Sequence, residues 1–332
     1  MVVAALAFVA LPIETGNANF LTDLFKGSSK PSKPPRHGSA PKPAVSAKPV
    51  TSPKPHLAEK TLEPKPVAQK CEPAKFHLVV DVGHTLQSDG AMSARNVPEF
   101  KFNLNLAQRL VQKLKASGFV QTRLLVTEGR ARPSLFKRVA AANNSDADLF
   151  LSIHHDSVPD KMMEDWEFEG KKSHFSDRFS GYGLFVSKSN ADFQSSMRFA
   201  HLIGVQMKAE GLKFANQYTL PIMGKYRHDL LDKEAGIYRY DHLIVLMKTR
   251  MPAVLLEAGS IINRDEELQM ASPERQNLII KAVTTALKEY CRPAKPALEA
   301  SSQPQPAAPP PSVSVPAAQP QPQPPAELQP KP

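Results

Sequence analysis

The chain has little cysteine and no long apolar run, and these two absences exclude several classes of protein. Its two cysteines, Cys71 and Cys291, have no further cysteine or histidine at finger-like spacing, so they are not expected to bind metal. The apolar run Val2–Ile13 is too short to span a bilayer. No basic helix, aromatic-studded basic sheet motif or finger spacing is present, and nucleic acid is therefore not an expected partner.

Proline is scarce in the middle of the chain and dense on both sides of it. Of the 32 prolines, residues 21–75 contain 11, residues 292–332 contain 14 and residues 76–291 contain only 6, with Pro12 as the remaining one. Proline-dense segments cannot form a packed core. We therefore expect one folded domain at residues 76–291, between a disordered Lys/Pro-rich linker at residues 19–75 and a disordered Pro/Gln/Ala-rich tail at residues 292–332.

The formal net charge of +10 comes mainly from the N-terminal arm. Residues 21–75 carry 11 Lys and Arg against 4 Asp and Glu, a net charge of +7. Such an arm suits weak, salt-sensitive attraction to an anionic surface of the cell envelope. The alternative is that the arm is a soluble, semi-rigid charged spacer.

Export is predicted from the first 18 residues. Val2–Ile13 has about the length of a signal-peptide core, and Gly16-Asn17-Ala18 offers a small-residue cleavage site. No basic residue precedes the run, so we expect the true start to lie upstream. The alternative is an ordinary buried segment. Export would place the protein in the periplasm or cell envelope, where Cys71 and Cys291 could form a disulfide that closes the two ends of the domain. Two free thiols remain the other possibility.

Alternating strands and helices indicate an α/β fold. We expect a single domain with a largely parallel or mixed twisted sheet flanked by helices. Val158–Gly181 is expected to be a loop or a short helical insertion, and Leu220–His242 an irregular stretch. The expected strands are His77–Val82, Phe119–Thr127, Asp148–Ile153, Tyr182–Ser187 and Pro252–Glu257, and the expected helices are Phe100–Ser117, Pro133–Asn144, Ala191–Glu210 and Pro273–Tyr290.

Three of these strands lead into side chains that can carry chemistry, namely His84, His154 and Glu257. The carboxyl ends of strands in such sheets share one edge, where ligands and metals gather. Glu99 lies at the start of the helix after the first strand. Two imidazoles and a carboxylate form the ligand set of a catalytic zinc site, and a further carboxylate could take a proton from its water. His155 is a rival to His154, but neighbouring strand residues point to opposite faces, so one of the two can reach the metal.

Five blocks of sequence carry a resemblance over about residues 76–291. They are Asp81-Val82-Gly83-His84, then Glu99 followed by Asn103-Leu104, then Leu135-Phe136-Lys137-Arg138 with Ala142-Asn143, then Ala147-Asp148-Leu149-Phe150-Leu151-Ser152-Ile153-His154, then Pro252-Ala253-Val254-Leu255-Leu256-Glu257-Ala258-Gly259 with Asn263. Together they resemble the zinc-dependent N-acetylmuramoyl-L-alanine amidases of the Amidase_3 type.

The resemblance implies that His84, Glu99 and His154 bind Zn²⁺ and that Glu257 is the catalytic carboxylate. The implied reaction is hydrolysis of the amide between the lactyl group of N-acetylmuramic acid and L-alanine in peptidoglycan. Asp81 and Arg138 would support the site from behind the ligands, and Asp156 would add negative charge beside the metal. The chain departs from the family pattern at Val82, Phe100, His155-Asp156 and Ser260, and none of these departures removes a ligand or the catalytic carboxylate.

The resemblance also bears on partners and on the insertion at residues 158–181. Some cell-division amidases of this family have an inserted helix that occludes the cleft, so this insertion could be a regulatory lid opened by an activator protein. The alternative is a plain surface loop. We expect a monomer that acts on peptidoglycan. Two further hypotheses are a non-catalytic protein of this fold that binds the wall or activates a partner, and a zinc peptidase that cleaves another amide.

Overall fold

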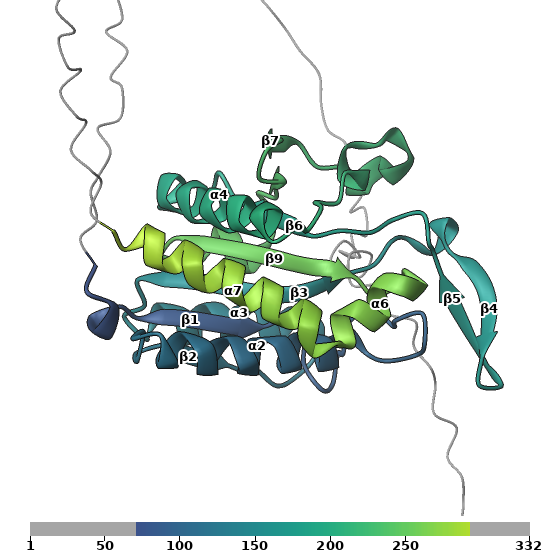
Figure 1. Cartoon of the computed structure of the whole chain (residues 1–332), viewed down its shortest axis with the longest axis horizontal. Helices are drawn as coiled ribbons and strands as arrows, with labels where there is room; N and C mark the ends of the chain where they lie inside the picture. Colours follow the sequence, from purple (N-terminus) through teal and green to yellow (C-terminus); the bar gives the residue numbers. More distant parts are fainter. Residues whose placement is uncertain (1–70, 293–332) are drawn as a thin grey trace, which may run out of the picture. The chain divides into compact units, whose positions relative to one another are not determined.

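The computed structural model describes residues 71–292, which form a layered α/β arrangement (Figure 1). The predicted signal peptide, the linker up to residue 70 and the tail beyond Arg292 lie outside the described residues. None of the helices within residues 71–292 has the length and apolarity needed to cross a membrane.

A seven-stranded mixed sheet forms the centre of the domain and confirms the predicted fold class. Four neighbouring strands run parallel, the fifth pairs antiparallel with its neighbour, and two short strands complete that edge. In spatial order the strands are β2 (Arg123–Leu125), β1 (Leu78–Val82), β3 (Leu149–Asp156), β9 (Ala253–Ser260), β6 (Gly183–Val186), β8 (Ile237–Arg239) and β7 (Leu230–Asp232).

Helices cover both faces of the sheet, which explains why the central strands are almost wholly buried. One apolar cluster joins Val80 and Val82 to three long helices, and a second joins Val79 to the helices on the other face. The first face carries α2 (Glu99–Ala116), α4 (Phe193–Ala209) and α7 (Pro273–Tyr290), and the second carries α3 (Ala131–Asn143) and α5 (Ile244–Met247) (Figure 1).

The insertion at residues 158–181 differs from the expected loop or helical segment. After a short 3-10 turn, η2 (Asp160–Met162), it forms an antiparallel hairpin of β4 (Glu164–Phe168) and β5 (Lys171–Phe175). The turn at Glu169 and Gly170 has φ angles of 51° and 74°, the left-handed pair that two-residue hairpin turns require. The hairpin extends beyond the end of the sheet near α6 (Arg264–Ala271) (Figure 1).

Several strand boundaries also differ from the expectation. β3 and β9 continue to Asp156 and Ser260, so His154 lies inside its strand rather than after it, and Glu257 lies inside its strand rather than at its end. The strand expected at Phe119–Thr127 shrinks to the three residues of β2. The stretch expected to be irregular contains η4 (Pro221–Tyr226) and the short strands β7 and β8.

A disulfide joins Cys71 to Cys291, which selects between the two alternatives left open for the cysteines. The Cα atoms are 4.8 Å apart across a sequence separation of 220 residues. Closing so long a loop restricts the unfolded chain and contributes about 5 kcal/mol in the chain-entropy account. Cys71 precedes the 3-10 turn η1 (Pro73–Lys75) and Cys291 caps α7, so the bond ties the beginning and the end of the domain together.

Candidate metal centre

Three buried side chains converge at the carboxyl end of β1 and β3. The imidazole nitrogens of His84 and His154 and the Glu99 carboxylate place ligand atoms within 4.8 Å of one another, close enough for one metal ion. His84 Nε2 lies 2.9 Å from Glu99 Oε2, and His154 Nδ1 lies 3.0 Å from Glu99 Oε1. The structure thus brings together the three residues that the sequence suggested as ligands.

Two glycines allow the backbone to lie close to the side chains of this metal-binding group. A Cβ atom on Gly83 would lie 2.5 Å from the His154 ring, and one on Gly90 would lie 2.5 Å from Glu99 Oε2. Gly90 has a φ of 84°, and His84 itself has a φ of 67°, in the left-handed region that non-glycine residues rarely adopt. Strained backbone of this kind persists where neighbouring contacts hold it.

Arg138 and Asp81 supply that support for His84. The Arg138 guanidinium donates a hydrogen bond to the His84 carbonyl oxygen, and its Nε lies 3.6 Å from Asp81 Oδ1. Ser152 Oγ donates to Asp81 Oδ2 over 2.7 Å. Burial raises the pKa of Asp81, while the Arg138 charge and the Ser152 hydrogen bond oppose that shift. Both residues therefore lie behind a proposed ligand.

Asn103 is a member of the site to which the sequence analysis gave no role. One turn into α2 from Glu99, its Nδ2 donates to Glu99 Oε1 over 3.0 Å and to the Gly83 carbonyl over 3.2 Å. Its Oδ1 accepts from His155 Nδ1 at 2.8 Å. The signal available in the sequence was the spacing of four residues from Glu99, which places both side chains on one helix face. Asn103 thus fixes the carboxylate that the two imidazoles share.

His155 lies apart from the metal-binding group. Its ring packs 5.6 Å from the Phe102 ring on the α2 side of the sheet, as the alternation of side chains along β3 requires. Burial lowers the pKa of His155 to about 3. Its role is consistent with a neutral buried side chain that orients Asn103.

The donor set fits a divalent metal of the zinc type. Burial lowers the pKa of His154 to about 4, although Glu99 opposes the shift, so this imidazole is neutral near pH 7 and keeps a lone pair. Burial by itself raises the pKa of Glu99, but the two histidines outweigh it and hold that pKa well below its usual range. Neutral imidazoles with an ionised carboxylate are ligands that zinc accepts.

Glu257 lies on β9 directly opposite His154 on β3. Its Oε2 atom is buried and has no hydrogen-bond partner among residues 71–292. Burial raises the pKa of Glu257 well above its usual range, and the nearby Asp156 and Glu99 carboxylates add to the shift. A carboxyl group with a raised pKa beside a metal-binding group can take up a proton and release it again, and so can act as a general base and acid.

Asp156 is held two residues beyond His154 by a second set of contacts. It accepts hydrogen bonds from Tyr218 Oη at 2.6 Å, from the Ser157 N–H at 2.8 Å and from Gln217 Nε2 at 3.3 Å. Burial raises the pKa of Asp156 to about 7 despite these bonds. Tyr218 and Gln217 come from η3 (Gln217–Thr219), to which the sequence analysis assigned no chemistry.

The hairpin of β4 and β5 holds the segment that leads into Glu99. The buried Ala94 carbonyl accepts hydrogen bonds from Trp166 Nε1 and from Ser173 Oγ, both at 2.8 Å. The adjacent Arg95 donates to Glu267 Oε2 over 2.6 Å, and its guanidinium lies 5.7 Å from the Trp166 ring centroid. The hairpin and α6 therefore brace the loop between the first two proposed ligands.

Known proteins are similar to this chain in sequence and in fold. The sequence profile of one protein family, described as N-acetylmuramoyl-L-alanine amidase, matches residues 78–289. A putative N-acetylmuramoyl-L-alanine amidase of Buchnera aphidicola subsp. Baizongia pistaciae is 25% identical over 223 residues, which cover 64% of this chain and 95% of that protein.

Two further proteins are matched over different fractions of their own length. The N-acetylmuramoyl-L-alanine amidase AmiC of Escherichia coli is 24% identical over 230 residues, covering 64% of this chain and 52% of AmiC. A crystal structure of an N-acetylmuramyl-L-alanine amidase from Mycobacterium smegmatis aligns with a TM-score of 0.50 and 19% identity, over 67% of this chain and 99% of that one. The structural likeness shows a shared fold.

Proposed function

Because the chain belongs to the Amidase_3 family of N-acetylmuramoyl-L-alanine amidases, enzymes of peptidoglycan, we propose that it cleaves the amide between the lactyl group of N-acetylmuramic acid and L-alanine. The observation that carries this proposal is the buried group of His84, Glu99 and His154 with Glu257 on the neighbouring strand. A family match alone gives the class of enzyme, whereas this arrangement supplies the groups that the hydrolysis needs.

His84, Glu99 and His154 would hold Zn²⁺. Bound zinc supplies a water of lowered pKa and polarises a carbonyl oxygen. Around it, Asn103 and the Ala91 N–H fix the two Glu99 oxygens, with hydrogen bonds of 3.0 Å and 3.2 Å. Arg138 holds the His84 backbone. The chain thus orients its ligands before any metal arrives, as outer contacts of metal sites generally do.

Glu257 would move the proton. Its buried Oε2 has no partner among the described residues and can accept a proton from the attacking water and return it to the leaving amine of L-alanine. The ionised carboxylate accepts the proton, and the raised pKa of Glu257 favours keeping that proton until it passes to the amine. Asp156, held by Tyr218, lies near Glu257, and its charge when ionised would favour the protonated form of Glu257 after the first step.

A disulfide in a cell-wall amidase family suggests a protein outside the cytoplasm, because such bonds persist in oxidising compartments. The same proposal includes cleavage of a signal peptide at residues 1–18, a periplasmic location and attraction of the basic arm to an anionic envelope surface. It also includes a folded domain at residues 76–291, a monomeric state, a role in cell division and an activator that opens the cleft.

The test is to incubate the purified protein with peptidoglycan and analyse the soluble products. We expect free stem peptides that begin with L-alanine, no release in the presence of a chelator, and recovery when zinc is added back. Absence of such peptides with the zinc-loaded wild-type protein would contradict the proposed reaction. Equal release by a Glu257→Gln variant would contradict the role given to that carboxylate.

A further inference from the structure

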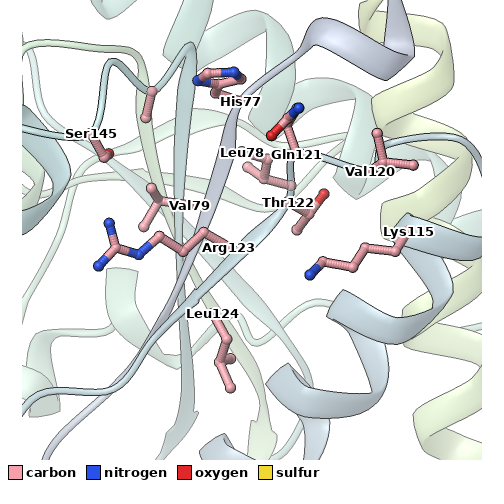
Figure 2. Close-up of a pocket in the computed structure, with 11 residues that line it drawn as sticks. His77, Leu78, Val79, Lys115, Val120, Gln121, Thr122, Arg123, Leu124 and Ser145 are labelled. Atoms are coloured by element: carbon pink, nitrogen blue, oxygen red, sulfur yellow. The ribbon is translucent and has the colours of Figure 1, made fainter.

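A cavity lies at the amino-terminal ends of β1 and β2, whereas the metal-binding group lies at the carboxyl end of β1. It has a volume of about 400 Å³ and is bordered by the first residues of β1, the end of α2, the segment leading into β2 and the loop after α3 (Figure 2). Strand β1 connects the two places, with Leu78 and Val79 in this cavity and His84 just past its other end. Five strand residues span roughly 16 Å, so a ligand here would not touch the proposed catalytic groups.

The charged residues that line this cavity are cationic. Lys115 and Arg123 are both exposed, and neither takes part in any ion pair that the structure of residues 71–292 shows. His77 adds an imidazole, and no Asp or Glu belongs to the lining. The nearby carboxylate of Asp148 already accepts the His77 backbone N–H over 2.8 Å. Two cations without a carboxylate partner favour an anionic ligand.

The rest of the lining is mixed, with the polar Gln121, Thr122 and Ser145 beside five apolar residues, and it lies next to a strand edge. The apolar residues are Leu78, Val79, Val120, Leu124 and Ala147, and Figure 2 shows Leu124 and Arg123 next to one another on the strand. Val120 is 52% exposed. β2 is the outermost strand and pairs with β1 alone, so its other side presents backbone groups to an incoming chain. An extended peptide can bind such an edge through main-chain hydrogen bonds.

We propose that the cavity and the β2 edge form a second, non-catalytic site that binds the carboxylate-bearing stem peptides of peptidoglycan. The apolar part of the lining and the open strand edge favour a peptide over a bare phosphate, and the two cations favour one with free carboxylates. The proposal rests on the proposed function for the identity of the polymer. Such a site would hold one part of the wall while the metal centre acts on another.

The experiment uses the full chain with Glu257→Gln, so that every binding measurement is made on a variant lacking the proposed proton carrier. The probe is the soluble tetrapeptide L-Ala-γ-D-Glu-meso-diaminopimelyl-D-Ala, titrated by calorimetry and followed by amide chemical shifts of Arg123–Leu125. We expect saturable shifts at these amides and a Kd that rises about tenfold in the double variant Lys115→Glu, Arg123→Glu. A matched double variant on distant exposed lysines, Lys208→Glu, Lys233→Glu, should change the Kd by less than about twofold.

Three results would overturn the proposal. They are absence of shifts at Arg123–Leu125, equal affinity for the tetrapeptide with its carboxylates converted to carboxamides, and displacement of the tetrapeptide by inorganic phosphate at the same concentration. Thermal unfolding of both double variants checks that each remains folded.

The binding and activity experiments distinguish failure of the second site from failure of the proposed amidase activity. If the zinc-loaded wild type releases no stem peptides but the tetrapeptide binds at β2, the proposed function fails and this site stands. If stem peptides are released but the tetrapeptide leaves Arg123–Leu125 unchanged, the second site fails and the amidase stands. With intact sacculi as substrate, the Lys115→Glu, Arg123→Glu variant should lose about tenfold in rate, while its rate on a small soluble muramyl peptide stays unchanged.

Discussion

Arg138, buried on α3, donates a hydrogen bond to the backbone carbonyl oxygen of His84, whose φ of 67° is otherwise unfavourable. One guanidinium thus serves both the backbone of a proposed metal ligand and the buried carboxylate of Asp81, 3.6 Å from its Nε. These two duties can be separated by mutation, because one concerns buried charge and the other concerns the position of a single carbonyl group.

Arg138→Ala should lower the free energy of unfolding by about 3 kcal/mol, because it leaves the Asp81 carboxylate buried without its cation. It should also weaken zinc binding, since the His84 carbonyl loses its donor. The double variant Asp81→Asn, Arg138→Met removes both charges and should recover most of the stability without recovering zinc affinity. Urea unfolding and competitive zinc titration measure the two effects. Recovery of both together would show that His84 is not positioned by Arg138.

Gly90→Ala should weaken zinc binding by about 10- to 100-fold, because its Cβ would lie 2.5 Å from Glu99 Oε2 and displace that carboxylate. Gly170→Ala is the matched control. Gly170 also has a left-handed φ, of 74°, but no atom lies within 4 Å of its would-be Cβ. Both variants should lose about 1 kcal/mol of stability through backbone strain. Equal zinc affinity in the two variants would exclude the proposed contact.

The two donors to the Ala94 carbonyl should act together. Trp166→Phe and Ser173→Ala each leave one hydrogen bond to this buried oxygen and should cost about 1 kcal/mol or less of stability. The double variant leaves the oxygen unsatisfied and should cost more than the sum of the two. Hydrogen exchange over residues 91–98 should accelerate in the double variant, and zinc affinity should fall with it. Strict additivity would indicate that the hairpin does not brace this loop.

Glu257→Gln should lower kcat by about 10² to 10⁴ while zinc stays bound, because the proton carrier is lost and the ligands are not. In the metal-free protein, the same substitution should raise the free energy of unfolding at neutral pH. The folded-state pKa of Glu257 lies above its unfolded value, so its contribution to stability is complete below about pH 4 and is lost as the pH rises toward the folded pKa.

Glutamine cannot ionise, so the Glu257→Gln variant does not lose stability in this way as the pH rises. Metal-free Glu257→Gln should therefore match the wild type near pH 4 and exceed it in stability at pH 7, as measured by urea unfolding at the two pH values. Glu234→Gln, at an exposed turn, serves as the control. A variant less stable than wild type at pH 7 would mean that the ionised Glu257 has a stabilising partner.

The sequence was informative where chemistry follows from local pattern. His84, His154 and Glu257 could be placed at one sheet edge because each lies in or just after an apolar strand, and parallel strands share that edge. Asn103 and Tyr218 could not be given roles in this way. Asn103 acts through Gly83 and His155, and Tyr218 acts on Asp156 across 62 residues, so their contacts depend on how distant elements pack.

The hairpin differs from the loop or helical segment predicted for residues 158–181, and its pattern explains the difference. Its inward side chains, Trp166 and Phe168, alternate with the charged Asp165 and Glu167, which is the period of a strand with one buried face. The abundance of charge in that stretch obscured the alternation. What stabilises the hairpin is its contact with Ala94 and Arg95, far away in the sequence, and no local propensity reports such a contact.

The bond between Cys71 and Cys291 has a mechanical consequence. The bond lies at the two ends of the part of the chain that the structure describes, and its Cα atoms are 4.8 Å apart. A force that pulls residues 71 and 291 apart would pass through this covalent link rather than through the hydrogen bonds of the sheet. The metal centre, at the far end of β1, would then bear none of the load.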